Sequence, residues 1–144
     1  MAEINECYAY FHIAGSFDPA DITKRVGIVP TEASAQGEPI PHTQMPRECS
    51  RWTLQSRLQR SAALELHVSD VLDQLDSNRG GFQKLSGEFG GVMELVGYFR
   101  AFYPGLYFEN SMVQRLAEYQ LAIDYDFYFL DDAPNQDPHS GTVS

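Results

Sequence analysis

Basic residues are scarce in this sequence, which holds ten lysines and arginines against twenty aspartates and glutamates, for a formal net charge of −10. Phosphate backbones and anionic lipid surfaces repel such a chain. The composition therefore argues against nucleic-acid binding and against electrostatic attachment to a membrane. A basic protein is the complementary partner.

Cysteine and long apolar runs are also scarce. Cys7 and Cys49 form no CxxC pair and have no histidine at metal-ligand spacing, so we expect two reduced, buried thiols and neither a disulfide nor a zinc site. The acidic residues 1–6 lack the basic region and apolar core of a signal peptide, and no apolar run approaches the roughly eighteen residues of a membrane helix. These absences predict a cytoplasmic location.

Motifs that identify a reaction are missing too. The glycine pairs at 80–81 and 90–91 fit neither a GxxxxGK[ST] loop nor a GxGxxG turn after a strand, and no HExxH, DxDxDG or GxSxG spacing occurs. Neither cysteine lies in a catalytic signature. We therefore expect no cofactor, no resident metal and no catalytic residues, and the sequence favours a non-enzymatic function.

The patterns that are present predict one α+β domain over residues 7–130, between a flexible N-terminus, 1–6, and a disordered tail, 131–144. Asp18 is a good N-cap, Pro19 suits the first helical position, and Gly27 can end the helix. Apolar periodicity predicts strands at 7–14, 51–56, 92–103 and 123–129, and helices at 19–26, 64–75, 82–89 and 111–118, the last capped by Asn110.

These elements predict a two-layer arrangement: a mixed, mostly antiparallel sheet of four to five strands with helices packed on one face. Gly37 and three prolines make residues 32–48 a long loop in which we expect no regular element. Trp52 is expected to anchor the core, and Ile123, Tyr125, Phe127 and Phe129 are expected to point inward. His67 lies on the apolar stripe of its helix, where a packed histidine is a better interpretation than a ligand.

If the helices cover one face of the sheet, the alternate residues gather on the other, which we call the open face. Its predicted partner-binding residues are Tyr8, Tyr10, His12, Arg51, Glu94, Tyr98, Arg100, Asp124, Asp126 and Tyr128, with Thr53 and Gln55 beside them. Aromatic rings with polar tips are typical of recognition surfaces.

Three interpretations of the open face stay open at this point. It can be a solvated sheet stabilised by cross-strand pairs. It can bind a partner or a small ligand. It can also be a catalytic or metal-binding site built from His12, Glu94, Asp124 and Asp126, although no motif spacing supports that.

The chain resembles a bacterial family catalogued as domain of unknown function 4279. The resemblance covers residues 7 to 130 and rests on the FDP motif at 17–19, GIVPT at 27–31, RWTL at 51–54 and IDYDFY at 123–128, with Ile22, Gly37 and the Leu116-Ala117 pair. The family name implies no activity. Small acidic bacterial domains of this kind are similar to immunity proteins and antitoxins encoded beside toxins, which is an analogy at the level of fold.

We therefore expect a non-enzymatic binding protein, an immunity-type inhibitor that neutralises a basic toxin or effector. The alternative is a small-ligand-binding protein or enzyme with a pocket between the loop at 32–48 and the sheet, using His12, Tyr10, Arg51 or His42 as polar contacts. The sequence does not define the oligomeric state.

Overall fold

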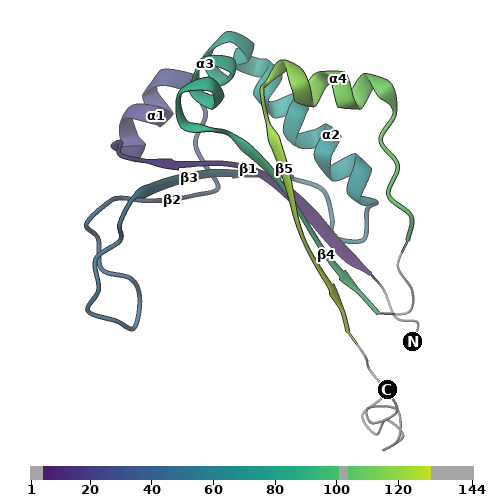
Figure 1. Ribbon diagram of the computed structural model, residues 1–144, viewed down its shortest axis with the longest axis horizontal. Coiled ribbons are helices and arrows are strands. Elements are labelled where there is room, and N and C mark those ends of the chain that lie inside the picture. Colours follow the sequence, from purple (N-terminus) through teal and green to yellow (C-terminus); the bar gives the residue numbers. More distant parts are fainter. Residues whose placement is uncertain (1–4, 101–103, 131–144) are drawn as a thin grey trace, which may run out of the picture.

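The computed structural model describes residues 5–100 and 104–130, and the predicted ends of the chain at 1–4 and 131–144 lie outside the described residues. Within these ranges a five-stranded sheet carries four α-helices on one side (Figure 1). The predicted α+β fold is confirmed. Its strands follow the order β2-β3-β1-β4-β5, with β1 at Glu6–Gly15, β2 at Glu32–Ser34, β3 at Ser50–Gln55, β4 at Val92–Phe99 and β5 at Ala122–Phe129.

All pairs of neighbouring strands are antiparallel except β4 and β5, which run parallel. A parallel pair needs a long crossover connection, and the segment that holds α4 provides it. Strand β1 is central and pairs with β3 on one edge and β4 on the other. The predicted strand at 92–103 ends at Phe99, and residues 101–103 lie outside the described part of the chain.

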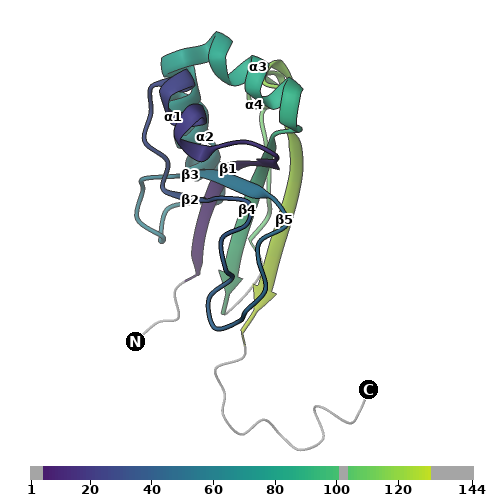
Figure 2. The ribbon, with the colours of Figure 1, turned by 90° about the vertical axis from the view of Figure 1, so that its left-hand side faces the viewer.

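The helix layer consists of α1 to α4, all on the same side of the sheet in both views (Figures 1 and 2). Helix α1 begins as expected, because the side chain of Asp18 accepts a hydrogen bond from the N–H of Ala20, and it ends at Gly27, whose φ of 77° suits glycine. The N-cap of α4 is Glu109, not the predicted Asn110, which is the first helical residue. The helices are α1 at Pro19–Val26, α2 at Leu64–Leu75, α3 at Arg79–Phe89 after a 3₁₀ turn at Asp76–Asn78, and α4 at Asn110–Glu118.

The core lies between the helices and the inner side of β1. Phe11 is fully buried there and makes edge-on ring contacts with Trp52 and Phe82, at centroid distances of 6.3 and 5.6 Å. Trp52 is fully buried as predicted, and its indole N–H donates to Oγ1 of Thr23, 3.0 Å away. An indole that packs and has a hydrogen-bond partner ties β3 to α1.

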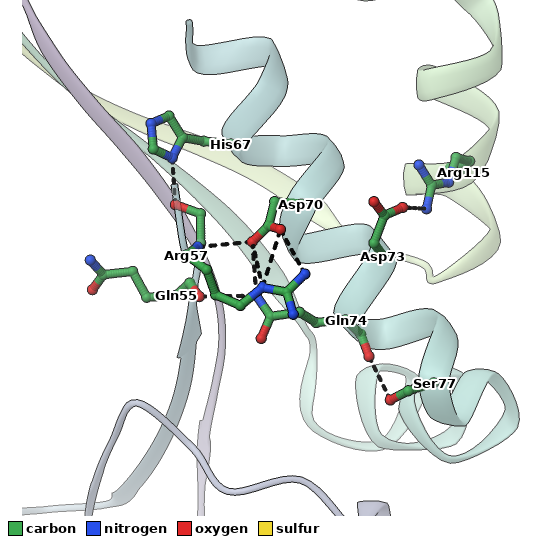
Figure 3. Close-up of polar contacts among 9 residues, drawn as sticks. Gln55, Arg57, His67, Asp70, Asp73, Gln74, Ser77 and Arg115 are labelled. Carbon is green, nitrogen blue, oxygen red and sulfur yellow. Dashed lines mark hydrogen bonds and ion pairs between the residues drawn. The ribbon is translucent and has the colours of Figure 1, made fainter. Parts of the chain in front are cut away.

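Polar contacts attach α2 to the end of β3 (Figure 3). The backbone N–H of Arg57 donates to Oδ2 of Asp70 at 2.8 Å, and its guanidinium donates to Oδ1 at 2.7 Å. One turn earlier on α2, Nδ1 of His67 contacts Oγ of Ser56 at 2.7 Å. His67 is fully buried, so the interpretation as a packed histidine is confirmed.

The expectation of no regular element in residues 32–48 is wrong. Residues 32–34 form β2, which pairs with β3, and the remainder is a hairpin-like loop closed by backbone bonds from Ile40 to Met45 and from Arg47 to Glu38. In both views the loop extends away from the helices (Figures 1 and 2). A three-residue strand is too short to show alternation, and it forms because β3 offers it a free edge.

The prediction that Ile123, Tyr125, Phe127 and Phe129 point inward is confirmed for Phe127, which packs against the core, whereas the other three remain exposed. Ile123, Tyr125 and Phe129 are 44%, 62% and 50% exposed, whereas Phe127 is half-buried and packs edge-on against Phe99 at 5.2 Å. Helix α4 lies above the beginning of β5, and the strand continues beyond it (Figure 1). Alternation therefore gave the side of the strand correctly but not its cover.

Both cysteines are free thiols. Cys7 is buried, as expected, whereas Cys49 in the segment before β3 is only half-buried.

Because Phe127 is half-buried and Tyr125 is exposed, replacing each by alanine should change the free energy of unfolding by different amounts. Phe127→Ala should lower the free energy of unfolding by about 2 kcal/mol, because it removes a ring packed on Phe99. Tyr125→Ala should cost less than about 1 kcal/mol, because its ring is 62% exposed and contacts the ring of Phe127 at 4.7 Å. Urea unfolding of both variants checks this, and equal costs would contradict the described cover of β5.

Candidate functional site

The open face is the side of the sheet opposite the helix layer, and the strand register brings its predicted residues together. Tyr10 on β1 lies between Gln55 on β3 and Glu94 on β4, while His12 lies opposite Thr53. Because β5 runs parallel to β4, Asp124 lies beside Glu94, Asp126 beside Val96, and Tyr128 beside Tyr98. Residues from four strands therefore form one continuous surface.

Aromatic rings run along the middle of this surface. Tyr8, Tyr10 and His12 follow one another on β1, with ring centroids 6.2 Å apart between the tyrosines and 5.5 Å between Tyr10 and His12. A second pair, Tyr98 and Tyr128, stacks across β4 and β5 at 5.1 Å. The row on β1 separates two regions of opposite charge.

The first region, the acidic half, consists of Glu94, Asp124 and Asp126. Glu94 is only 4% exposed, and its Oε2 is buried without a hydrogen-bond partner. Burial raises the pKa of Glu94 to about 7, with further contributions from the carboxyls of Asp126 and Asp124. A proton on Glu94 can be shared with Asp126, whereas ionised Glu94 places three carboxylates next to one another, with Nε2 of His12 lying 3.6 Å from Oε1 of Glu94.

No lysine or arginine in the described part of the chain forms an ion pair with these three carboxylates. Asp124 and Asp126 are exposed, so water stabilises their charges. Glu94 lacks that compensation, because it is covered by its neighbours. The acidic half therefore contains a buried carboxyl without a cationic partner, and burial keeps that carboxyl protonated up to about pH 7.

His12 connects the acidic half to the opposite region. Its Nε2 lies 3.6 Å from Oε1 of Glu94, and its Nδ1 lies 3.3 Å from a terminal nitrogen of Arg51. A guanidinium can only donate, so Nδ1 accepts and Nε2 carries the proton of a neutral ring. Burial, and then Arg51, lower the pKa of His12, although Asp124 acts in the other direction.

The second region, the arginine half, consists of Arg47, Arg51 and Arg60, which line two adjoining pockets. A pocket of about 300 Å³ lies between Arg47 of the β2–β3 loop and strands β2 and β3. A pocket of about 290 Å³ continues from Arg51 toward Tyr8, Tyr10 and Arg60. The guanidinium of Arg60 lies over the ring of Tyr8, 4.2 Å from its centroid.

The predicted site residues thus divide into groups that their spacing in the sequence did not reveal. Arg100 lies beyond the end of β4, where its backbone N–H donates to Oδ1 of Asn5. His42 is at the loop and lines neither pocket of the arginine half. Sequence reasoning missed Glu32, Arg47 and Arg60, because they lie in a three-residue strand and in loops without a periodic signal.

A metal site was one of the sequence-based interpretations of the open face. Within residues 5–100 and 104–130, no group of three histidines, cysteines or acidic residues has the geometry to hold a metal ion. In the same residues, no helix is long and apolar enough to cross a membrane.

Comparison with known proteins gives one result. The model of a family described as Domain of unknown function (DUF4279) matches residues 5–130. No curated protein and no solved structure matches the chain. The matched residues include every strand and helix described above.

The raised pKa of Glu94 predicts how Glu94→Gln changes stability with pH. The unfolded chain ionises this group near its ordinary pKa, whereas the folded chain holds the proton to about pH 7, so wild-type stability falls as pH rises through that range. The amide avoids this cost. The free energy of unfolding of the variant, relative to that of wild type, should therefore rise by on the order of 2 kcal/mol between pH 5 and pH 8.

Urea unfolding at several pH values measures that difference. The contribution of His12 is present in both proteins and largely cancels. Glu109→Gln, at an exposed position before α4, controls for the change from acid to amide. If the difference in free energy of unfolding between Glu94→Gln and wild type does not vary with pH, the pKa of Glu94 is not raised.

Proposed function

The chain belongs to the family described as Domain of unknown function (DUF4279), a description that names no activity. We propose that it is a non-enzymatic domain that binds a basic protein through its open face. We propose further that it is an immunity-type inhibitor, which neutralises a basic toxin or effector by covering its active cleft. The support comes from the charge and chemistry of the open face.

The observation that carries this proposal is the buried carboxyl of Glu94 beside the exposed Asp124 and Asp126, with its Oε2 lacking a hydrogen-bond partner. A buried acceptor without a donor costs about 1–3 kcal/mol, and more when it is charged. A lysine or arginine of a partner would form charge-assisted hydrogen bonds with the two exposed aspartates, and its charge beside Glu94 would stabilise the ionised form of that carboxyl. Binding would thus offset the cost that burial imposes on ionised Glu94 in the free protein.

Aromatic side chains next to the acidic half support the same proposal. Tyr128 is 46% exposed and stacks on Tyr98, so the two rings form a rigid platform beside Asp126. Tyrosines add contact area at little entropic cost and are enriched among the residues that dominate binding energy. Charged groups flanked by such rings are partly shielded from water, which strengthens an ion pair made there.

The distribution of charge supports a defined orientation of the partner. A net charge of −10 attracts a basic protein over a distance and raises its association rate. The arginine half would repel the same partner at the other end of the face, so the two halves select one orientation. Reduced thiols at Cys7 and Cys49 suit the cytoplasm of a bacterium, which we propose as the location.

A second candidate function rests on a different observation, the pair of pockets along the arginine half. The first pocket lies between the β2–β3 loop and the sheet, and the second includes Tyr10 and Arg51. A concave region with a few convergent polar groups is the usual form of a small-ligand site. A small-ligand-binding protein or enzyme is the alternative proposal.

The acidic half is tested by a pull-down from the lysate of the native host at low and at raised salt. Wild-type protein should capture one basic protein at low salt and lose most of it at raised salt, because salt screens the attraction. The double variant Asp124→Lys/Asp126→Lys should capture none, because its lysines would repel the partner and pair with Glu94.

Glu88→Lys/Glu109→Lys is the matched control, since it changes the net charge equally but on the helix layer. Capture by this control should stay close to that of wild type. The proposal fails if both double variants capture the protein equally, or if binding of the captured protein does not depend on salt.

A further inference from the structure

Four arginines in or next to the helix layer have carboxylate partners. Arg25 pairs with Glu88 at 2.8 Å, Arg57 with Asp70 at 2.7 Å, and Arg115 with Asp73 and Asp76 at 2.9 Å. Figure 3 shows Arg57 and Arg115 directed toward acidic residues of α2. Arg79 likewise pairs with Glu118 and Asp76. In a chain with twice as many acidic as basic side chains, such pairing is the expected outcome.

Arg47, Arg51 and Arg60 differ, because none of them pairs with a carboxylate in the described part of the chain. All three line the two pockets of the arginine half, which share Arg51, Thr53 and Glu32. Three arginines against the one carboxylate of Glu32 leave a positive potential in this concave region.

Backbone hydrogen bonds fix the positions of the two arginines that line the first pocket, Arg47 in the loop and Arg51 in β3. The N–H of Arg47 donates to the carbonyl of Glu38 at 2.7 Å, and its carbonyl accepts from Gly37 at 2.9 Å, so the loop fixes this residue on both sides. Its Nε is buried without a hydrogen-bond partner. Arg51 comes from the interior of β3 and uses one terminal nitrogen for His12. The remaining N–H groups of both side chains are donors without a protein acceptor among the described residues.

We propose that these pockets form one binding site for a small anionic ligand, whose phosphate or carboxylate group is held by Arg47 and Arg51. Planar guanidinium groups match oxyanions through paired hydrogen bonds, which the terminal N–H groups of Arg47 and Arg51 can form. Hydroxyl groups of Ser34 and Thr53, which also line the first pocket, can donate to the same oxyanion.

The second pocket gives the rest of the ligand its place. Tyr8 and Tyr10 line it together with Arg60, which covers one face of the Tyr8 ring, so a planar or apolar portion can pack beside Tyr10. Two adjoining pockets of about 300 and 290 Å³ are large enough for a small metabolite. The inference rests on the second candidate function and is independent of the binding of a basic protein at the acidic half.

Glu32 is the acidic residue of the two pockets, and it provides a test of the proposal in the opposite direction. It lines both pockets, and its carboxylate opposes any anion that enters. It is not within ion-pair distance of Arg47 or Arg51. Glu32→Gln should therefore strengthen anion binding, whereas loss of the arginines should weaken it. If anion binding depended only on the net charge of the protein, removing a charge at any other exposed position would have the same effect as removing it at Glu32, Arg47 or Arg51.

The test measures binding of sodium pyrophosphate, inorganic phosphate and succinate by calorimetry and by the shift in Tm, against sodium chloride at equal ionic strength. At least one of these anions should raise Tm by mass action. Arg47→Gln/Arg51→Gln should weaken its binding at least tenfold, and Glu32→Gln should strengthen it about threefold, from loss of one repulsive charge. The phosphate and succinate arms show which oxyanion the site prefers.

Arg25→Gln/Lys84→Gln is the matched control, because it removes two positive charges from the helix layer. It should leave anion binding unchanged. The proposal is overturned if no anion exceeds sodium chloride, if this control weakens binding as much as the pocket variant, or if Glu32→Gln has no effect. Binding of neutral adenosine to wild type and to the arginine double variant alike would leave a small-ligand function standing without the anion site.

Discussion

The central strand β1 determines where every other part of the molecule lies. Its apolar residues, such as Phe11, face the helix layer, and its aromatic and polar residues, such as Tyr10, face the other way. Both edges of β1 are paired, so a shift of one residue would expose the core residues and bury the tyrosines. The helices cover the apolar side because that is where burial is favourable, and the open face remains.

β1 also divides the open face into two chemically distinct halves. Arginines lie on the side of β2 and β3, and carboxylates lie on the side of β4 and β5. Between them, His12 contacts both Arg51 and Glu94. Each half contains a buried polar atom without a hydrogen-bond partner, Nε of Arg47 in one and Oε2 of Glu94 in the other. Nε2 of His67 in the core is a further buried atom of this kind, so the proposed binding at the two halves is supported by these atoms together with the exposed charged groups around them.

Local patterns predicted the parts of the fold that depend on local physics. Alternation placed Tyr8 and Tyr10 on the open face, and the cap at Asp18 defined the start of α1. What the sequence could not show depends on pairing between distant segments. Strand β2 forms only because β3 accepts it, and the burial of Glu94 follows from its neighbours on β1 and β5. The division of charge across the face requires the strand order, which periodicity does not contain.

Amide NMR spectra of the intact chain, titrated separately with a hexalysine peptide and with pyrophosphate, test the two-part open face most directly. The peptide should shift amide signals of β4 and β5 around Glu94 and Asp124. Pyrophosphate should shift those of β2, β3 and the loop around Arg47. Each should leave the helix layer and the opposite half nearly unchanged, since both are distant from the charges that it contacts. Shifts from either probe that are spread over the helices, or that coincide in one half, would contradict the account.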